Sequence, residues 1–545
     1  MKIVHRSTGR QAPANLFWLL LATGALLVGL VLGNAGAIPA LENSWHNLQR
    51  RLATAAPSNE LPVLTANIDF EDYNQLLSER EDALDKGVLM PDDSTFVPAT
   101  IHPYGDQEIR VWIRLLPGTA NHLGANDKWN FELVTRDDVD LLGATHANLL
   151  DPADNNWVNQ WAFLEALRHE GLPSGSYQFV QLILNGNDRG IYALQEDLRP
   201  LVTNENNQPG AVVLSYDIEP LLEVVSNYGD IGSAVADPVS NLAGADPRFL
   251  QVAEIDDPLV TDDELLSQQF ERGTALLRGL QSGELAASEV FDAQQYGRFL
   301  ALVDLWGASN ALSPFYLHYI YNSELDRLQP LVTNANPLAG DFRLPPEAMY
   351  QDAGIQAAYA SAVAEISSAA YLSNLRSVLG DQYADLEHAM VAEIDRFPIW
   401  DELAARQELL QLSLHPAQPI IAQLGSPDLA QEAIIRVNVA NALNLPLEVL
   451  GFDIDGATFL PVNPEWIAAG EAYHQTADER IILDPIPGES AGLRFVTFDL
   501  PVTEIIRLDD EIDFLNEIEI QVATSVLGID DQQMTPASPG LNNGG

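Results

Sequence analysis

The sequence contains no cysteine, and only 3 of its 545 residues are lysine. Without cysteine the chain has no disulfides, no thiolate chemistry, no cysteine-based zinc site and no lipid-modified cysteine. Basic residues are scarce overall, since 27 Lys and Arg stand against 78 Asp and Glu, for a formal net charge of −51. A nucleic-acid-binding surface needs clustered Lys and Arg, so we expect no nucleic acid and no other polyanion among the partners.

The composition is nevertheless that of a folded protein. Apolar residues make up 47% of the chain, which at this length is enough for two to four hydrophobic cores. Mutual repulsion of acidic side chains keeps a protein soluble when salt screens its charges. An ordinary acidic exported protein and a salt-adapted one both fit this composition.

One long apolar run, LFWLLLATGALLVGLVLG, occupies residues 16–33. At about 1.5 Å per residue, it is long enough as a helix to cross a hydrocarbon core of roughly 30 Å. Lys2, Arg6 and Arg10 precede it, which favours a cytoplasmic N-terminus and an extracytoplasmic bulk, periplasmic or at the cell surface. The sequence therefore predicts a single-pass membrane anchor; the alternative is a cleaved signal peptide, because residues 35–37 are small.

Further along, several segments show the periodicity of strands. Residues 108–116 and 128–134 alternate between apolar and polar side chains, as paired strands do. Asn185-Gly186 between two apolar runs predicts a β-hairpin. Beyond about residue 430, short strands separated by Pro, Gly and Asn predict a small β-sandwich. Within it, Asp453-Ile454-Asp455-Gly456 begins like a calcium loop but lacks the later ligands, so we expect a hairpin turn there.

Six pieces of the chain, in order, resemble the CotH kinase family, the spore-coat and exported relatives of protein kinases. The resemblance covers roughly residues 60–340. It rests on RVWIRLLPG, DKWNFEL, LLGATHANLLDP, WAFLEALRHEGLPSGSYQFVQLILNGNDRGIYALQEDL, DLWGASNAL and YIYNSELDRLQPL.

The resemblance implies an α+β fold with an atypical, protein-kinase-like, two-lobed domain, followed by a helical segment and a C-terminal β-sandwich, with an N-terminal transmembrane helix. The expected divisions are a cytoplasmic tip and anchor or signal (1–37), a linker (38–60), the kinase-like domain (61–345) with an acidic helical insertion (220–295), a helical segment (346–425), a β-sandwich (430–530) and a disordered tail (531–545).

In the family a strand lysine is thought to contact nucleotide phosphates, and Lys128 matches its position. The carboxylate that follows the family's hairpin matches Glu196, which could pair with Lys128 and hold it toward the phosphates of ATP, as the Lys-Glu pair does in kinases. Two alternatives stay open: Lys128 could be a solvated lysine at a strand edge, and Glu196 an ordinary carboxylate at a strand end.

The family's catalytic and metal positions are substituted here. By ungapped reading, Asn310 replaces a His, Tyr316 replaces an Asn, and Asn334 replaces the Asp that would bind magnesium. Asn334 and Asn336 offer only neutral carbonyl oxygens, which attract Mg²⁺ far less than carboxylates do. The resemblance with these departures implies a pseudokinase or scaffold at the cell envelope, in which the affinity for Mg²⁺, and with it for ATP, has fallen steeply.

A shift in register would bring Asp304, Asp326 or Asp341 into the metal position instead. An active ATP-dependent Ser/Thr kinase of envelope or secreted proteins is therefore the alternative function. A structural or adhesion protein is a second alternative. In each case the expected partners are the membrane, through the N-terminal helix, and envelope or secreted proteins.

Overall fold

The structure is a computed structural model, and the residues it describes all belong to a unit of residues 59–545. They are 61–103, 107–124, 128–136, 139–196, 201–202, 211–232, 250–253, 258–340, 352–391, 393–394, 397–415, 418–425, 434–443, 445–456, 458–467, 473–475, 481–483, 495–501 and 518–539. The predicted membrane anchor and linker lie outside these residues. Within the described part of the chain, no helix combines the length and apolar character needed to cross a membrane.

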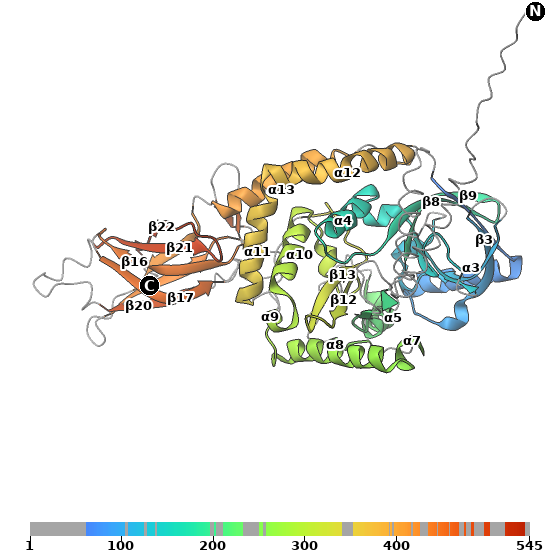
Figure 1. The fold of residues 1–545 in the computed structure, drawn as a ribbon, viewed down its shortest axis with the longest axis horizontal. Helices are drawn as coiled ribbons and strands as arrows, with labels where there is room; N and C mark the ends of the chain where they lie inside the picture. The colour runs from blue at the N-terminus through green and yellow to red at the C-terminus, as the bar shows by residue number, and fades with distance from the viewer. Residues whose placement is uncertain are drawn as a thin grey trace, which may run out of the picture. The chain divides into compact units, whose positions relative to one another are not determined.

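Seven strands near the start of the described chain close into a barrel (Figure 1). In spatial order these strands are β1 (Val63–Ile68), β3 (Val97–His102), β4 (Ile109–Leu115), β6 (Phe131–Thr135), β7 (His146–Leu150), β9 (Asn187–Glu196) and β8 (Tyr177–Leu184). Neighbouring strands are antiparallel, except that β1 pairs with β8 in parallel and closes the ring. Helix α3 (Phe70–Lys86) contacts β4. The barrel encloses its own apolar core.

The strand pairs predicted from alternation are confirmed. Strands β4 and β6 pair with Arg114 opposite Glu132, and Arg114 Nε donates a 2.8 Å hydrogen bond to Glu132 Oε2. Both side chains are buried, so each charge compensates the other. The predicted hairpin joins β8 to β9, and Asn185 and Gly186 both have the positive φ that a type I′ turn requires.

A second apolar core lies among the helices that follow. Its helices include α4 (Val158–His169), α8 (Glu264–Ser282), α10 (Ala293–Leu305), α11 (Ala353–Ile366), α12 (Ala369–Ala389) and α13 (Ile399–Leu414). Strands β10 (Leu201–Val202), β11 (Ala211–Leu214), β12 (Leu317–Asn322) and β13 (Arg327–Val332) form a four-stranded sheet beside them. Helix α11 packs on α10, and α12 packs on α4.

The described residues of the insertion predicted at 220–295 are mainly helical. They form most of α5 (Glu219–Gly232), then α7 (Pro258–Thr261), α8 and α9 (Ala287–Val290).

The C-terminal strands form two four-stranded sheets. Their residue ranges extend beyond both ends of the predicted sandwich, 430–530. One sheet contains β20 (Val496–Pro501), β15 (Ile434–Asn441), β14 (Ile420–Leu424) and β23 (Ser538–Pro539); the other contains β17 (Thr458–Ile467), β16 (Leu447–Ile454), β21 (Ile520–Val526) and β22 (Gln533–Pro536). Phe452 of the second sheet packs against Phe498 of the first, with ring centroids 5.2 Å apart. The predicted turn at 453–456 joins β16 to β17.

Two boundary predictions in this region were wrong. The helical segment ends at Leu414, and residues 420–424 already belong to the sheets. The segment 531–539 was predicted as part of a disordered tail, but it supplies β22 and β23. Backbone groups at the edges of β21 and β14 provide hydrogen-bonding partners for these strands, and the tail sequence does not reveal them.

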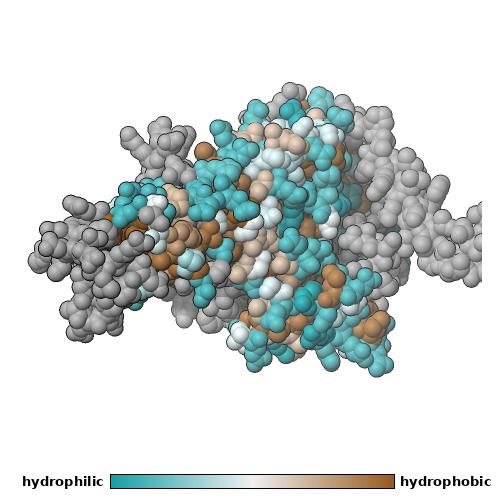
Figure 2. Space-filling model, turned by 60° about the vertical axis from the view of Figure 1, so that its left-hand side comes forward, coloured by the Kyte–Doolittle hydropathy of each residue, from teal (hydrophilic) through white to brown (hydrophobic). Residues whose placement is uncertain are grey.

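The predicted mixture of helices and strands is confirmed, and the seven-stranded closed barrel was not anticipated. Most of the described surface visible in Figure 2 is hydrophilic, and apolar side chains gather there only in limited areas. This surface agrees with the excess of acidic residues in the sequence.

Removing the C-terminal strands tests the corrected boundary. A chain ending at Asp530 loses the pairing of β22 with β21 and of β23 with β14, so we expect the free energy of unfolding of the sandwich to fall by about 2 kcal/mol or more. Scanning calorimetry and limited chymotrypsin digestion would measure this loss. A chain ending at Pro539 keeps both strands and serves as the control. Equal stability of the two truncated chains would contradict the prediction.

Candidate functional site

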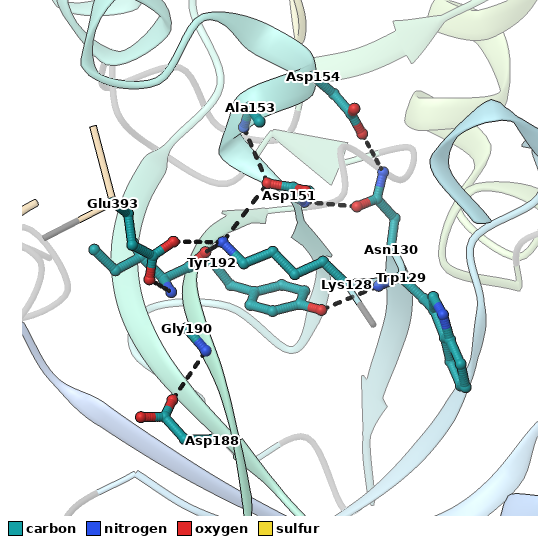
Figure 3. Close-up of polar contacts among 11 residues, drawn as sticks. Lys128, Trp129, Asn130, Asp151, Ala153, Asp154, Asp188, Gly190, Tyr192 and Glu393 are labelled. Atoms are coloured by element: carbon teal, nitrogen blue, oxygen red, sulfur yellow. Dashed lines mark hydrogen bonds and ion pairs between the residues drawn. The ribbon is translucent and has the colours of Figure 1, made fainter. Parts of the chain in front are cut away.

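Lys128 lies just before β6 and is surrounded by acceptors. Its Nζ atom donates hydrogen bonds to Glu393 Oε2 at 2.6 Å and to the carbonyl oxygen of Ile191 at 3.1 Å. A third acceptor, Asp151 Oδ1, lies 3.9 Å from the same nitrogen. Figure 3 shows the ammonium group between these carboxylates. The ammonium group therefore has two hydrogen-bond acceptors and a further carboxylate at ion-pair distance.

Aromatic rings complete the surroundings of Lys128. Its Nζ lies 5.2 Å from the ring centroid of Trp157 and 5.9 Å from that of Tyr192, within cation–π range. The Tyr192 hydroxyl accepts a 3.1 Å hydrogen bond from the backbone N–H of Trp129. Only 19% of the Lys128 side chain is exposed, so the interpretation as a solvated strand-edge lysine is wrong.

Glu393, on the connection between α12 and α13, is the main ionic partner of Lys128. Its Oε1 also accepts a 2.8 Å hydrogen bond from the backbone N–H of Ile191. The carboxylate lies so close to Gly190 that a Cβ atom there would be 2.6 Å from Oε1. Because 265 residues separate Glu393 from Lys128, no local sequence pattern could have indicated this pair.

The predicted pairing of Lys128 with Glu196 is not observed. Glu196 is the last residue of β9 and lies opposite Ala147 of β7, and its backbone N–H donates to Ser176 Oγ at 3.3 Å. Ile191, whose carbonyl binds Lys128, lies five positions earlier on the same strand. The extended strand carries Glu196 away, and Glu393 is the carboxylate that pairs with Lys128.

Two aspartates lie on the turn before α4: Asp151 is 3.9 Å from Lys128, and Asp154 is linked to Asp151 through Asn130. Asp151 accepts a hydrogen bond from the backbone N–H of Ala153 at 3.1 Å and donates its own N–H to Asn130 Oδ1 at 2.6 Å. Asn130 Nδ2 donates to Asp154 Oδ2 at 3.3 Å. Carboxylates are therefore present near Lys128, although the matched metal position carries Asn334. Two aspartates just before α4 were the available sequence signal.

The electrostatics of Asp154 differ from those of a solvated aspartate. Although Asp154 is an exposed residue, partial desolvation of its carboxyl group and the negative charge of Asp151 raise its pKa, and the hydrogen bond from Asn130 opposes this shift. A raised pKa means that the folded protein disfavours the ionised form, which is the form that binds cations.

The asparagines at the predicted metal position are engaged within the protein. Asn334 Nδ2 donates to Asn155 Oδ1, and Asn334 Oδ1 accepts a 3.2 Å hydrogen bond from the N–H of Asn336. Gln160 Oε1 accepts from the N–H groups of Ala335 and Asn336 at 3.0 and 3.2 Å. Nowhere in the described residues do three His, Cys, Asp or Glu side chains gather as a metal centre would require.

Of the two predicted catalytic positions, one lies near this group. Burial raises the pKa of the Tyr316 hydroxyl, and the charge of Asp154 raises it further, so the two side chains are within electrostatic reach. Asn310 lies on a short 3₁₀ helix, Ser309–Leu312, where its carbonyl accepts from the N–H of Ser313 at 3.0 Å. Among the described residues, no hydrogen bond joins the Asn310 side chain to the Lys128 group.

The structure thus brings Lys128, Asp151 and Asp154 together, and Asn334 joins them through Asn155 on the same turn. Comparison of the sequence with models of known protein families gives no match, and comparison with curated proteins gives none either. The chemistry of the site therefore has to be argued from its geometry.

The close approach of Glu393 to Gly190 can be tested with a pair of glycines. Gly190 and Gly186 have similar positive φ, 83° and 78°, but a Cβ meets Glu393 only at Gly190, while Gly186 has open space. We expect Gly186→Ala to cost about 1 kcal/mol through backbone strain alone. Gly190→Ala should cost at least about 1 kcal/mol more, because it displaces the Glu393 carboxylate from Lys128 and Ile191.

Denaturant unfolding of the two variants would measure the difference. Adding Glu393→Ala to both should remove most of the extra cost at Gly190, since the crowded atom is then gone. An extra cost that persists without Glu393 would show that this contact is not responsible.

The raised pKa of Asp154 makes a prediction about stability and pH. Because the folded state favours the protonated form, ionisation of Asp154 lowers stability as pH rises from about 3.9, the ordinary aspartate value, through the raised folded value. Asp154→Asn removes that cost, so we expect a small rise in melting temperature at pH 7 that vanishes below about pH 3.9. Asp381→Asn, exposed on α12, is the control for loss of one negative charge. A rise that is the same at both pH values would contradict the assignment.

Proposed function

We propose that this chain is an exported, membrane-tethered recognition protein with a CotH-like, kinase-like domain, in which the cleft at Lys128 no longer transfers phosphate. The observation that carries the proposal is that the Lys128 ammonium already donates to Glu393 and to the Ile191 carbonyl, with the Asp151 carboxylate 3.9 Å away. A nucleotide phosphate approaching Lys128 would meet these two carboxylates, whose negative charges repel it.

The residues at the predicted metal position support the same proposal. Phosphoryl transfer requires cations, held by hard oxygen ligands, that bridge the nucleotide phosphates. At the matching position Asn334 supplies only a neutral amide, already bonded to Asn155 and Asn336. Without a bound cation, the repulsion between a triphosphate and the surrounding carboxylates is not offset.

The second candidate is an active kinase of envelope or secreted proteins, and two observations favour it. An ion pair between a lysine and a glutamate is a requirement of protein kinases, and Lys128, just before β6, forms one with Glu393. Asp151 is a carboxylate 3.9 Å from that lysine, and Asp154 is connected to it through Asn130, so carboxylates are available near the lysine, as a metal site would need. The two candidates differ in what they predict for metal-dependent nucleotide binding.

Calorimetric titration of the full chain in detergent with ATP and Mg²⁺ or Mn²⁺ separates the candidates. The recognition protein is expected to show no metal-dependent binding and no transfer of labelled phosphate to Ser- or Thr-containing acceptors. Glu393→Gln, which removes the charge that neutralises Lys128, is expected to allow weak ATP binding without transfer.

The active kinase makes the opposite forecast. It requires metal-dependent ATP binding and transfer by the native chain, and loss of transfer in both Lys128→Met and Glu393→Gln. Observing that set of results would replace the proposed function with the second candidate.

A further inference from the structure

A pocket of about 290 Å³ lies next to Lys128, between the start of α4 and the connection from α12 to α13. Its walls include the side chains of Trp157, Asn159, Tyr383, Glu387, Glu393 and Phe397. The volume is at the small end of ligand sites, which suits one side chain or one small organic molecule rather than a whole nucleotide.

The lining of this pocket combines aromatic rings with negative charge. Trp157, Tyr383 and Phe397 supply ring surfaces, while Glu387 and Glu393 supply carboxylates; no Lys, Arg or His is among the described residues that line it. Aromatic faces and carboxylates both attract cations. The same surroundings repel a phosphate or carboxylate ligand.

Two residues that line the pocket, Trp157 and Glu393, already bind a cation, the ammonium group of Lys128. This group lies 2.6 Å from Glu393 Oε2 and 5.2 Å from the ring centroid of Trp157. A second cation in the pocket would thus meet the same kind of carboxylate and indole surface that the protein uses to hold its own lysine.

The walls are fixed before any ligand arrives. Trp157 has φ 54° and ψ −128°, an unfavourable conformation for a residue other than glycine. It is held by a hydrogen bond from its N–H to the carbonyl of Pro152 at 2.8 Å, and the Asn156 amide donates to the carbonyl of Pro337 at 2.6 Å. On the opposite wall, the Tyr383 hydroxyl donates to Asn159 Oδ1 at 2.9 Å.

Glu387 is positioned by the backbone of the wall it faces. Its Oε1 accepts a 2.9 Å hydrogen bond from the N–H of Phe397. Burial raises the pKa of the Tyr383 hydroxyl, and the Glu387 charge raises it further. The Glu387 carboxylate lines the pocket together with the rings of Tyr383 and Phe397.

We propose that this pocket binds an organic cation, a guanidinium or ammonium group on an aliphatic stem, as presented by an Arg or Lys side chain of a partner polypeptide. The stem would pack on the rings while the charged end faces Glu387 and Glu393. The inference goes beyond the proposed function, because it holds whether or not the Lys128 cleft binds a nucleotide.

The experiment titrates the full chain in detergent with three ligands in a calorimeter. These are acetyl-Gly-Arg-Gly-amide, the same peptide with neutral citrulline in place of Arg, and free arginine. We expect saturable one-to-one binding of the arginine peptide and at least tenfold weaker binding of the citrulline peptide. Absence of saturable binding of the arginine peptide, or equal affinity for the two peptides, overturns the proposal. Tighter binding of free arginine than of the peptide overturns the assignment to a polypeptide.

Two variants locate the binding in the pocket. Glu387→Gln keeps an acceptor for the Phe397 N–H but removes the charge, and we expect about tenfold weaker peptide binding. Phe397→Leu removes an aromatic wall from a residue that is 38% exposed, and we expect about threefold weaker binding.

The control for the overall charge is Asp385→Asn, an exposed residue of α12 that does not line the pocket. It changes the net charge as Glu387→Gln does and should leave the affinity within twofold of the native value. Native-like peptide affinity in both pocket variants, each confirmed as folded by thermal unfolding, overturns the proposal. Equal weakening by Asp385→Asn also overturns it, because attraction to the net charge would then explain the binding.

Discussion

The ion pair between Lys128 and Glu393 is the interaction on which the candidate site depends. It joins the edge of the barrel to the connection between two helices 265 residues further along the chain. The side chain of Lys128 is only 19% exposed, and an ammonium group with so little access to water is costly unless it is paired. The Glu393 carboxylate supplies that pairing. The contact also requires a glycine at position 190, because Glu393 occupies the space of a side chain there.

Around this ion pair, negatively charged side chains outnumber positively charged ones among the residues described. Asp151, Asp154 and Glu387 lie near the cleft or the adjoining pocket. The ammonium of Lys128 is the internal partner of two carboxylates, those of Asp151 and Glu393. Negative groups around the cleft and the pocket favour a cationic ligand over an anionic one.

The net charge of the whole chain also favours cationic over anionic partners. A formal net charge of −51 repels polyanions over the range that salt leaves unscreened and attracts basic partners. Such long-range attraction is not selective. Selectivity requires a defined pocket in which rings and carboxylates meet at fixed positions, and the walls formed by Trp157 and Tyr383 are held by hydrogen bonds in that way.

The sequence by itself determined the features that depend on neighbouring residues. Alternation over 108–116 and 128–134 and the Asn185-Gly186 turn predicted strands that pair as expected, because strand period and turn geometry are local properties. Only the tertiary structure decided the closure of the barrel by β1 and β8, the pairing of residues 533–539 with the sheets, and the choice of Glu393 over Glu196 as the partner of Lys128. These contacts join segments far apart in the chain, and their energies depend on packing and desolvation that no local pattern encodes.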